Sequence, residues 1–213
     1  MKNLIVTGGT GGLGTSVVAR LASDYRCILL SRHAGGDPNV IQADLADETS
    51  VRDAIATAVQ RFGEPYGLLH MAGGWVGGPV SETSSETWQQ MIGLNLTSSF
   101  LAIRETLGKM RRDAPGRIIA VSSEATITRD AGSAAYTVAK TGLNTLIEMT
   151  AAELAGTPIT ANALLPATLD TPASREAMPD APRVPLGRVA DAIAFLLSDA
   201  AAGITGALIP LRP

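Results

Sequence analysis

A tyrosine and a lysine four residues apart form the first pair that could do chemistry. In the stretch SAAYTVAK, Tyr136 and Lys140 fall in a segment with a helical pattern, and their spacing places both side chains on one helix face. A free tyrosine titrates at about 10, so it transfers protons poorly at neutral pH. A nearby ammonium favours the phenolate and lowers that pKa, which makes acid or base catalysis by Tyr136 feasible. Because such pairs also occur by chance on helix surfaces, the pair alone leaves the function open.

Two adjacent serines precede this helix, in the stretch AVSSEA. They close an apolar strand pattern, and the carboxyl ends of strands face the ligand crevice of a doubly wound sheet. A serine hydroxyl there can hydrogen-bond a substrate oxygen as charge develops on it. Ser122 and Ser123 point to opposite faces if the strand persists, so the residues leave the choice between them open.

A glycine-rich turn lies at the start of the chain. TGGTGGLG, residues 7–14, follows a strand pattern and opens a helical one. Such a turn presents backbone N–H groups and the positive end of a helix dipole to a pyrophosphate. Gly8 and Gly12 would allow the tight turn and close approach, and Gly14 would let the helix pack on the strand. We therefore expect a nucleotide site; the alternative is a glycine-rich connection without a ligand.

The end of the second apolar segment favours one nucleotide. Sites that prefer NAD usually place a carboxylate there for the adenosine ribose. Here the segment ends in Ser31, Arg32 and His33, and a hydroxyl with a guanidinium suits a 2′-phosphate. We expect NADP(H) rather than NAD(H); in the alternative, Arg32 is an ordinary solvated side chain.

The composition is that of one globular domain. The chain has 213 residues, 46% hydrophobic and 17% charged, with a formal net charge of −3. No basic run predicts nucleic-acid binding, and no apolar run approaches the roughly 20 residues that cross a bilayer. The single cysteine, Cys27, excludes an intrachain disulfide and a cysteine-based metal cluster, and we expect it to be inert in a buried strand. Since a strand pattern follows Met1 directly, we expect a cytoplasmic protein.

Short apolar segments alternate with longer helical ones, which is typical of a parallel sheet with crossover helices. Only SRHAGGDP separates the second and third strands, so we predict a short loop there instead of a helix. The expected fold class is α/β: residues 1–213 form a single Rossmann-type domain, a doubly wound parallel sheet of about seven strands with helices on both faces. The expected strands are 3–7, 26–30, 39–43, 67–72, 117–123, 159–165 and 207–211, and the expected helices are 12–23, 47–62, 84–113, 133–155 and 187–199.

Taken in order, these motifs resemble those of the short-chain dehydrogenase/reductase family along nearly the whole chain. TGGTGGLG resembles its TGxxxGxG turn and HMAG its NNAG stretch, while the Tyr136 and Lys140 pair resembles its catalytic pair. The family's spacing between serine and tyrosine selects Ser123. Further motif positions fall on Asp44, Asn95 and Thr171. The cofactor contacts that the resemblance implies are Gly8, Thr10, Gly11, Gly12, Leu13, Gly14, Ser31, Arg32, Asp44, Leu45, Ala72, Gly73, Gly74, Tyr136, Lys140, Pro166, Thr168 and Thr171.

The resemblance also implies a role for each catalytic residue. Tyr136 would be the general acid for carbonyl reduction or the base for alcohol oxidation. Lys140 would lower the pKa of Tyr136 and hold the nicotinamide ribose. Ser123 would position the substrate oxygen, and Asn95 would support a water-linked proton path through Lys140. Hydride transfer itself belongs to the cofactor.

The chain departs from the family pattern at several points. His70 and Met71 replace the two asparagines of NNAG, which leaves the bracing of that strand open, and Ala167 replaces a glycine. Gly11 stands where many NADP-using members carry a basic residue. The chain ends without the usual acid and glycine tail, which puts part of the family's oligomer interface in doubt.

A tryptophan stands among four glycines in MAGGWVGGPV. An indole packs well against a planar ring, and AGGWVGG and LDTPASREAMP resemble segments of quinonoid dihydropteridine reductase, a branch of the same family. We expect Trp75, Met178 and Ser123 to bind substrate and residues 172–185, with four prolines, to form a lid. A role for Trp75 in covering only the cofactor stays open.

The expected function is therefore that of an enzyme, an NAD(P)(H)-dependent oxidoreductase that transfers a hydride between the nicotinamide and a small carbonyl or alcohol. One alternative is a dihydropteridine-reductase-like enzyme that reduces a planar pterin. An alternative of another class is a catalytically silent NADP-sensing protein. We expect a small-molecule substrate, no nucleic acid, membrane or metal partner, and a homodimer or homotetramer built through helices 84–113 and 133–155.

Overall fold

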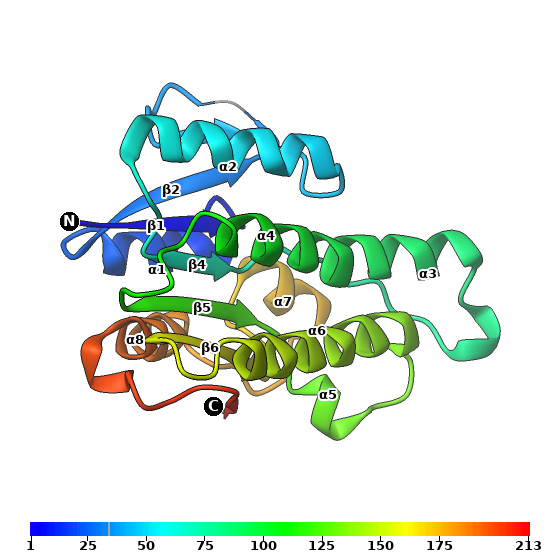
Figure 1. Cartoon of the computed structure of the whole chain (residues 1–213). Coiled ribbons are helices and arrows are strands. Elements are labelled where there is room, and N and C mark those ends of the chain that lie inside the picture. Colours follow the sequence, from blue (N-terminus) through cyan, green and yellow to red (C-terminus); the bar gives the residue numbers. More distant parts are fainter. Residues whose placement is uncertain (34) are drawn as a thin grey trace.

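The computed structural model describes residues 1–33 and 35–213, and its centre is one parallel sheet of seven strands (Figure 1). The strand order is β3-β2-β1-β4-β5-β6-β7, so the chain reverses its winding direction between β1 and β4. The carboxyl ends of these strands leave a crevice at that switch point, where ligands bind in folds of this kind. The strands are β1 (Lys2–Thr7), β2 (Tyr25–Ser31), β3 (Val40–Gln42), β4 (Gly67–His70), β5 (Gly116–Val121), β6 (Ile159–Pro166) and β7 (Leu208–Leu211).

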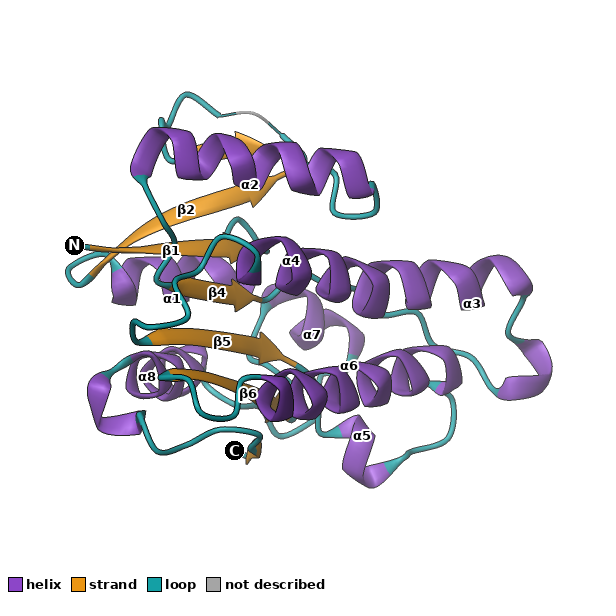
Figure 2. Cartoon of the chain, in the orientation of Figure 1, coloured by secondary structure: helices purple, strands orange, loops and turns teal. Residues whose placement is uncertain are grey.

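Helices cover both faces of the sheet, as Figure 2 shows. On one face α2 (Glu48–Phe62), α4 (Ser98–Leu107) and α6 (Ala134–Glu153) pack against one apolar cluster. On the other face α1 (Gly12–Leu21) and α8 (Leu186–Leu197) pack against a second cluster. Strands β4, β5 and β6 are buried at every position, which explains why they are apolar throughout rather than alternating. The predicted fold class is confirmed.

Several predicted boundaries follow from local signals. Asp47 caps α2, since its Oδ1 accepts a hydrogen bond of 2.6 Å from the Ser50 N–H. No helix lies between β2 and β3 in the part of the chain that is described, as predicted; Ala34, within this loop, lies outside the described residues. Cys27 lies in β2 and is half-buried rather than buried, and burial raises the pKa of its thiol to about 11.

The predicted helix 84–113 is wrong as a continuous element. The chain instead forms α3 (Ser85–Ile92), a π-helical turn η2 (Gly93–Thr97) and then α4, which ends six residues early. Strands β4 and β5 also end two residues before the predicted limits, so Ser122 and Ser123 follow the strand. Four short elements were not predicted: η1 (Val80–Glu82), α5 (Ala125–Thr128), α7 (Pro172–Ala177) and η3 (Asp199–Ala201). Among the described residues, no helix is long and apolar enough to span a membrane.

Candidate active site

The glycine turn packs tightly against the end of β4. Gly8 has a φ of +71°, and a Cβ there would come within 2.6 Å of the Ala72 nitrogen. A Cβ on Gly14 would lie 2.1 Å from the Gly8 carbonyl oxygen. Glycine at these two positions therefore lets the chain turn sharply and lets α1 begin against the sheet.

The amino end of α1 is open toward the crevice. Its N-cap residue Gly11 offers no side-chain acceptor to the first-turn N–H groups, so these groups are available to an anion. Thr10, Gly11 and Gly12 are exposed, whereas Leu13 is buried in the core. The Thr171 methyl group lies over Gly12, 3.4 Å from the position that a Cβ would take.

Residues predicted to hold the adenosine end gather at the carboxyl ends of β2 and β3. Ser31 pairs with Gln42 across the two strands, and its carbonyl accepts a hydrogen bond of 2.8 Å from the Ala43 N–H. Asp44 follows at once and is exposed, as is Arg32. Leu45, next to Asp44, packs against the core.

Asn95 links the turn after β4 to the helical layer. The side chain is buried in η2, and its Nδ2 donates to the Gly74 carbonyl at 3.0 Å while its Oδ1 accepts from the Gly74 N–H at 3.2 Å. A Cβ on Gly73 would lie 2.6 Å from Asn95 Oδ1 and 3.3 Å from Lys140 Nζ. Bare backbone is thus required between Asn95 and Lys140.

Tyr136, in the first turns of α6, is largely buried, and burial raises the pKa of its phenol. A hydrogen bond with the Ser123 side chain acts in the opposite direction. Lys140 Nζ donates to the Val121 carbonyl at 2.9 Å, and burial lowers the pKa of Lys140 to about 8. Burial thus outweighs the opposing influence of Ser123 on the pKa of Tyr136, and the lowering of that pKa by Lys140 stays a prediction.

The two serines left open by the sequence have different surroundings. Ser122 is buried, and its hydroxyl donates to the Lys140 carbonyl at 3.3 Å. Ser123 is half-buried and pairs with Tyr136. Of the two serines, Ser123 is the one whose side chain influences the Tyr136 phenol, and its catalytic role stays a prediction.

Trp75 lies on a loop that is joined to the start of α6. The Gly78 N–H donates to the Gly132 carbonyl at 2.7 Å, and Gly78 and Ser133 form a β-bridge. The indole packs over Gly77, where a Cβ would come within 2.8 Å of the ring, and 62% of the tryptophan remains exposed. These contacts place the loop that carries the exposed indole beside the residues that precede the Tyr136 helix in space.

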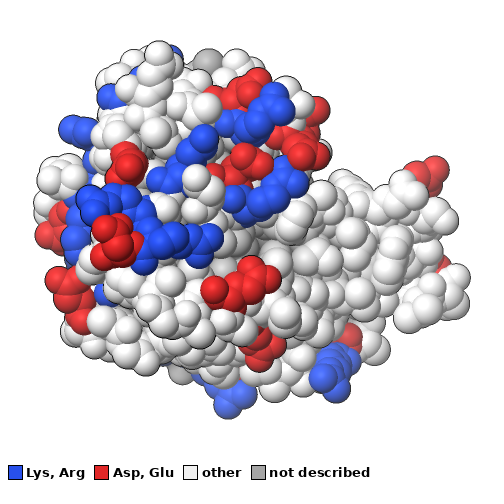
Figure 3. Space-filling view, viewed as in Figure 1, with Lys and Arg blue, Asp and Glu red and all other residues white. Residues whose placement is uncertain are grey.

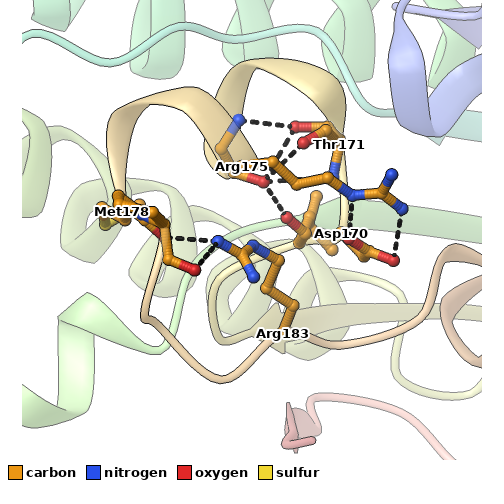
Figure 4. A network of polar contacts seen from close by, with 8 residues as sticks. Asp170, Thr171, Arg175, Met178 and Arg183 are labelled. Atoms are coloured by element: carbon orange, nitrogen blue, oxygen red, sulfur yellow. Dashed lines mark hydrogen bonds and ion pairs between the residues drawn. The ribbon is translucent and has the colours of Figure 1, made fainter.

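The predicted lid, residues 172–185, begins with the short helix α7 and is held by polar contacts with the residues just before it and within it (Figure 4). Thr171 and Ser174 form a capping box at the start of α7. Arg175 makes a bidentate ion pair with Asp170, at 2.7 and 2.9 Å. Arg183 donates to the backbone carbonyl of Met178, whose side chain is exposed.

The base of this segment continues from β6. Pro166 is the last residue of β6, and the Pro166 carbonyl accepts a hydrogen bond of 3.0 Å from the Glu124 N–H. The Thr168 carbonyl accepts from the Val184 N–H at 2.8 Å, which ties the end of the segment to its beginning. Among the described residues, no group of three or more His, Cys, Asp or Glu side chains could hold a metal ion.

Comparison with known proteins identifies the class of protein. The family model described as enoyl-(acyl carrier protein) reductase matches residues 15–211. A 2,5-dichloro-2,5-cyclohexadiene-1,4-diol dehydrogenase from Sphingobium indicum is 30% identical, over 99% of this chain and 94% of that protein. The cis-4-hydroxycyclohexanecarboxylate dehydrogenase of Sinomonas cyclohexanicum is 31% identical, over 96% and 92%. The ligand-free aldohexose dehydrogenase of Thermoplasma acidophilum superimposes with a TM-score of 0.90 at 26% identity, over 99% and 92%.

The chain belongs to the short-chain dehydrogenase/reductase family of oxidoreductases, whose members use NAD(P)(H). Its fold, its glycine turn and its Tyr136 helix agree with that membership.

Proposed function

We propose that this protein is an NADP(H)-preferring oxidoreductase that interconverts a secondary alcohol and a ketone on a small cyclic substrate. The observation that carries the proposal is the gathering of Ser123, Tyr136, Lys140 and Asn95 beside the glycine turn. Two relatives act, by their names, on six-membered carbon rings, and an exposed indole suits a ring-shaped substrate. Pterin reduction is the second candidate, since Trp75 would equally suit a planar ring.

The residues present fit a dinucleotide. The space beside Gly8 and Gly14 leaves no room for side chains, and the uncapped first turn of α1 suits a pyrophosphate. Ser31, Arg32 and Asp44 are grouped where the adenosine end would lie, and Thr171, just before the lid, covers Gly12. The remaining contacts proposed for the cofactor are Thr10, Gly11, Gly12, Leu13, Leu45, Ala72, Gly73, Gly74, Tyr136, Lys140, Pro166 and Thr168.

In the proposed mechanism the bound nicotinamide supplies or accepts the hydride. Ser123 donates a hydrogen bond to the substrate oxygen and so orients it toward Tyr136. Tyr136 gives its phenolic proton to that oxygen in ketone reduction and takes it back in alcohol oxidation. Lys140 holds the ribose, and Asn95 keeps the Gly73 and Gly74 backbone in place beside it. We take residues 172–185, with Met178 and Trp75, as the wall that excludes water from the reacting atoms.

A panel of oxidants tests this function. NADPH and NADH consumption would be measured with substituted cyclohexanones, with an acyclic 3-oxoacyl thioester and with freshly generated quinonoid dihydropterin. We expect a cyclic ketone to give the fastest enzyme-dependent oxidation of NADPH. Faster oxidation of NADPH with the pterin would favour the second candidate. Tight NADPH binding with no turnover on any of the three would favour a nucleotide sensor instead.

The preference for NADP(H) predicts a selective effect at Arg32. Arg32→Gln should weaken NADPH binding about tenfold to a hundredfold, because a charge-assisted hydrogen bond to phosphate is lost, and should leave NADH binding nearly unchanged. Fluorescence titration with each nucleotide measures both. Arg52→Gln, at an exposed arginine on α2, is a control with the same charge change. An unaltered ratio of the two affinities in Arg32→Gln would remove Arg32 from the phosphate site.

We also propose that the protein forms at least a dimer through the α4 and α6 layer. Figure 3 shows few charged side chains on the surface over α3 and the adjoining part of α6. Phe100 on α4 and Met149 on α6 are large apolar side chains that are 44% and 54% exposed, and contact with a second copy would remove them from water. A cytoplasmic location stays a prediction.

Light scattering after gel filtration tests the assembly. Wild-type protein should elute as a dimer or tetramer, and Phe100→Glu should reduce its mass, because a carboxylate would be buried in the interface. Phe195→Glu is a matched control, since Phe195 is 49% exposed on α8, in the opposite helical layer. A monomeric wild-type protein at micromolar concentration would contradict the proposal.

A further inference from the structure

The buried histidine at the end of β4 connects three elements of the site. His70 is fully buried, and both ring nitrogens are hydrogen-bonded. Nδ1 lies 2.8 Å from Thr7 Oγ1 at the end of β1, and Nε2 lies 2.9 Å from Ser99 Oγ on α4. One imidazole therefore spans from the start of the glycine turn to the helix that follows Asn95.

The neighbouring contacts fix which way each hydrogen bond runs. Ser99 Oγ donates its single proton to the Asn95 carbonyl at 2.8 Å, so it can only accept from His70. Nε2 must then carry the hydrogen. The ring is neutral near pH 7, because burial and the positive charge of Lys140 lower the pKa of His70 to about 3. Nδ1 is consequently an acceptor, and the Thr7 hydroxyl donates to it.

The result is a one-way chain of hydrogen bonds between two parts of the site. At one end the Ala72 N–H donates to Thr7 Oγ1 at 3.4 Å. The chain then passes through His70 and Ser99 to the Asn95 carbonyl. Each member uses its only available proton, so the chain has one arrangement and the imidazole one tautomer.

The Asn95 end of this chain determines the turn beside Lys140. The Asn95 amide holds Gly74 through two hydrogen bonds and also donates to the Met91 carbonyl at 3.1 Å. Gly73 lies between Asn95 and Lys140 with no room for a Cβ. A displacement of Asn95 would therefore displace the backbone against which the reacting groups are placed.

We propose that His70 is a positioning residue for Asn95: as a neutral imidazole with hydrogen on Nε2, it fixes the Asn95 backbone through Ser99 and so sets the geometry of the Gly73 and Gly74 turn. This inference rests on the proposed oxidoreductase function. His70 does not touch the substrate or the cofactor, and its effect passes through Ser99.

Two substitutions of His70 separate its hydrogen bond to Thr7 from its hydrogen bond to Ser99. The amide nitrogen of glutamine reaches as far along the side chain as Nε2, so His70→Gln retains the donor to Ser99. The asparagine side chain ends at the level of Nδ1, so His70→Asn retains the hydrogen bond to Thr7 and loses the one to Ser99. Asparagine is also the residue that the family's NNAG stretch carries, so a loss in His70→Asn would be due to the particular partner, Ser99, in this chain.

The kinetic test compares these variants with Ser99→Ala. His70→Asn and Ser99→Ala should each lower kcat roughly tenfold, about the effect of one misplaced hydrogen bond, with little change in the Kd for NADPH. His70→Gln should restore most of the activity. The double variant His70→Asn with Ser99→Ala should lose no more than either single one, because both break the same link. Equal losses in His70→Asn and His70→Gln, or none in either, would overturn the proposal.

A spectroscopic test works even if no substrate is found. The chain has two histidines, so long-range nitrogen–proton spectra of wild type and His33→Gln assign the His70 ring. The proposal expects hydrogen on Nε2 only. It also expects the Asn95 side-chain amide signals to shift in His70→Asn and Ser99→Ala and to return in His70→Gln. Hydrogen on Nδ1, or unmoved amide signals, would overturn the inference, whereas absent turnover in the wild type would instead count against the proposed function.

Discussion

Tyr136→Phe is expected to lower kcat by about two to four orders of magnitude, the usual contribution of a general acid or base. The substitution removes only the phenolic oxygen and keeps the ring that packs in the first turns of α6. Folding and NADPH affinity should therefore change little, and the loss should lie in kcat rather than in KM. Steady-state kinetics in both directions, ketone reduction and alcohol oxidation, measures it.

Tyr66→Phe is the matched control for this prediction. The Tyr66 hydroxyl donates to the Leu197 carbonyl at 2.7 Å, at the far end of the sheet from the candidate site. Its removal costs about 1 kcal/mol of stability, as for an ordinary hydrogen bond, and should leave kcat unchanged. If Tyr136→Phe kept more than half of the wild-type kcat, Tyr136 would not be the proton donor.

Gly14→Ala is expected to destabilise the protein by about 3 kcal/mol, at the upper end of the cost of overpacking. The added Cβ would lie 2.1 Å from the Gly8 carbonyl oxygen and 2.6 Å from the Gly9 backbone, and neither is a flexible side chain. The start of α1 must therefore move, and NADPH binding should weaken with it. Thermal unfolding should show a Tm lower by roughly 6 to 12 °C for a chain of this size.

Gly11→Ala, three residues earlier in the same turn, is its control. Gly11 has a φ of −79°, and its Cβ would meet nothing closer than 3.4 Å. Gly11→Ala should lower the free energy of unfolding by less than about 1 kcal/mol, since the only loss is the preference for glycine over alanine at the N-cap. Equal Tm values for the two variants would contradict the packing of α1 on the Gly8 turn.

Much of the fold could be predicted because its signals are local. The uniformly apolar strands, the glycine turn and the cap at Asp47 each depend on a few neighbouring residues. The interruption at Asn95 could not be predicted, because the helical pattern continues through it. Within this interruption Asn95 bonds Gly74, 21 residues away in sequence, and only the folded chain provides that contact.

The site shows the same division between local and long-range information. The spacing of Tyr136 and Lys140 predicts a shared helix face, but not that burial raises the pKa of Tyr136 and lowers that of Lys140. The sequence marks His70 as a departure from the family pattern, yet its partners, Thr7 and Ser99, lie 63 and 29 residues away. A buried polar residue needs hydrogen-bond partners, and only the structure shows which residues these are.

The central claim is that the chain catalyses hydride transfer between a nicotinamide and a ring carbon, and deuterium transfer tests it most directly. The protein would be incubated with NADPH carrying deuterium at C4, on either face in separate reactions, and with substituted cyclohexanones. We expect one deuterium on the carbinol carbon of the product from one face only, and about a hundredth or less of that product with Tyr136→Phe in the same time. Product without deuterium from either label, or no product from any cyclic or acyclic ketone despite NADPH binding, would contradict it.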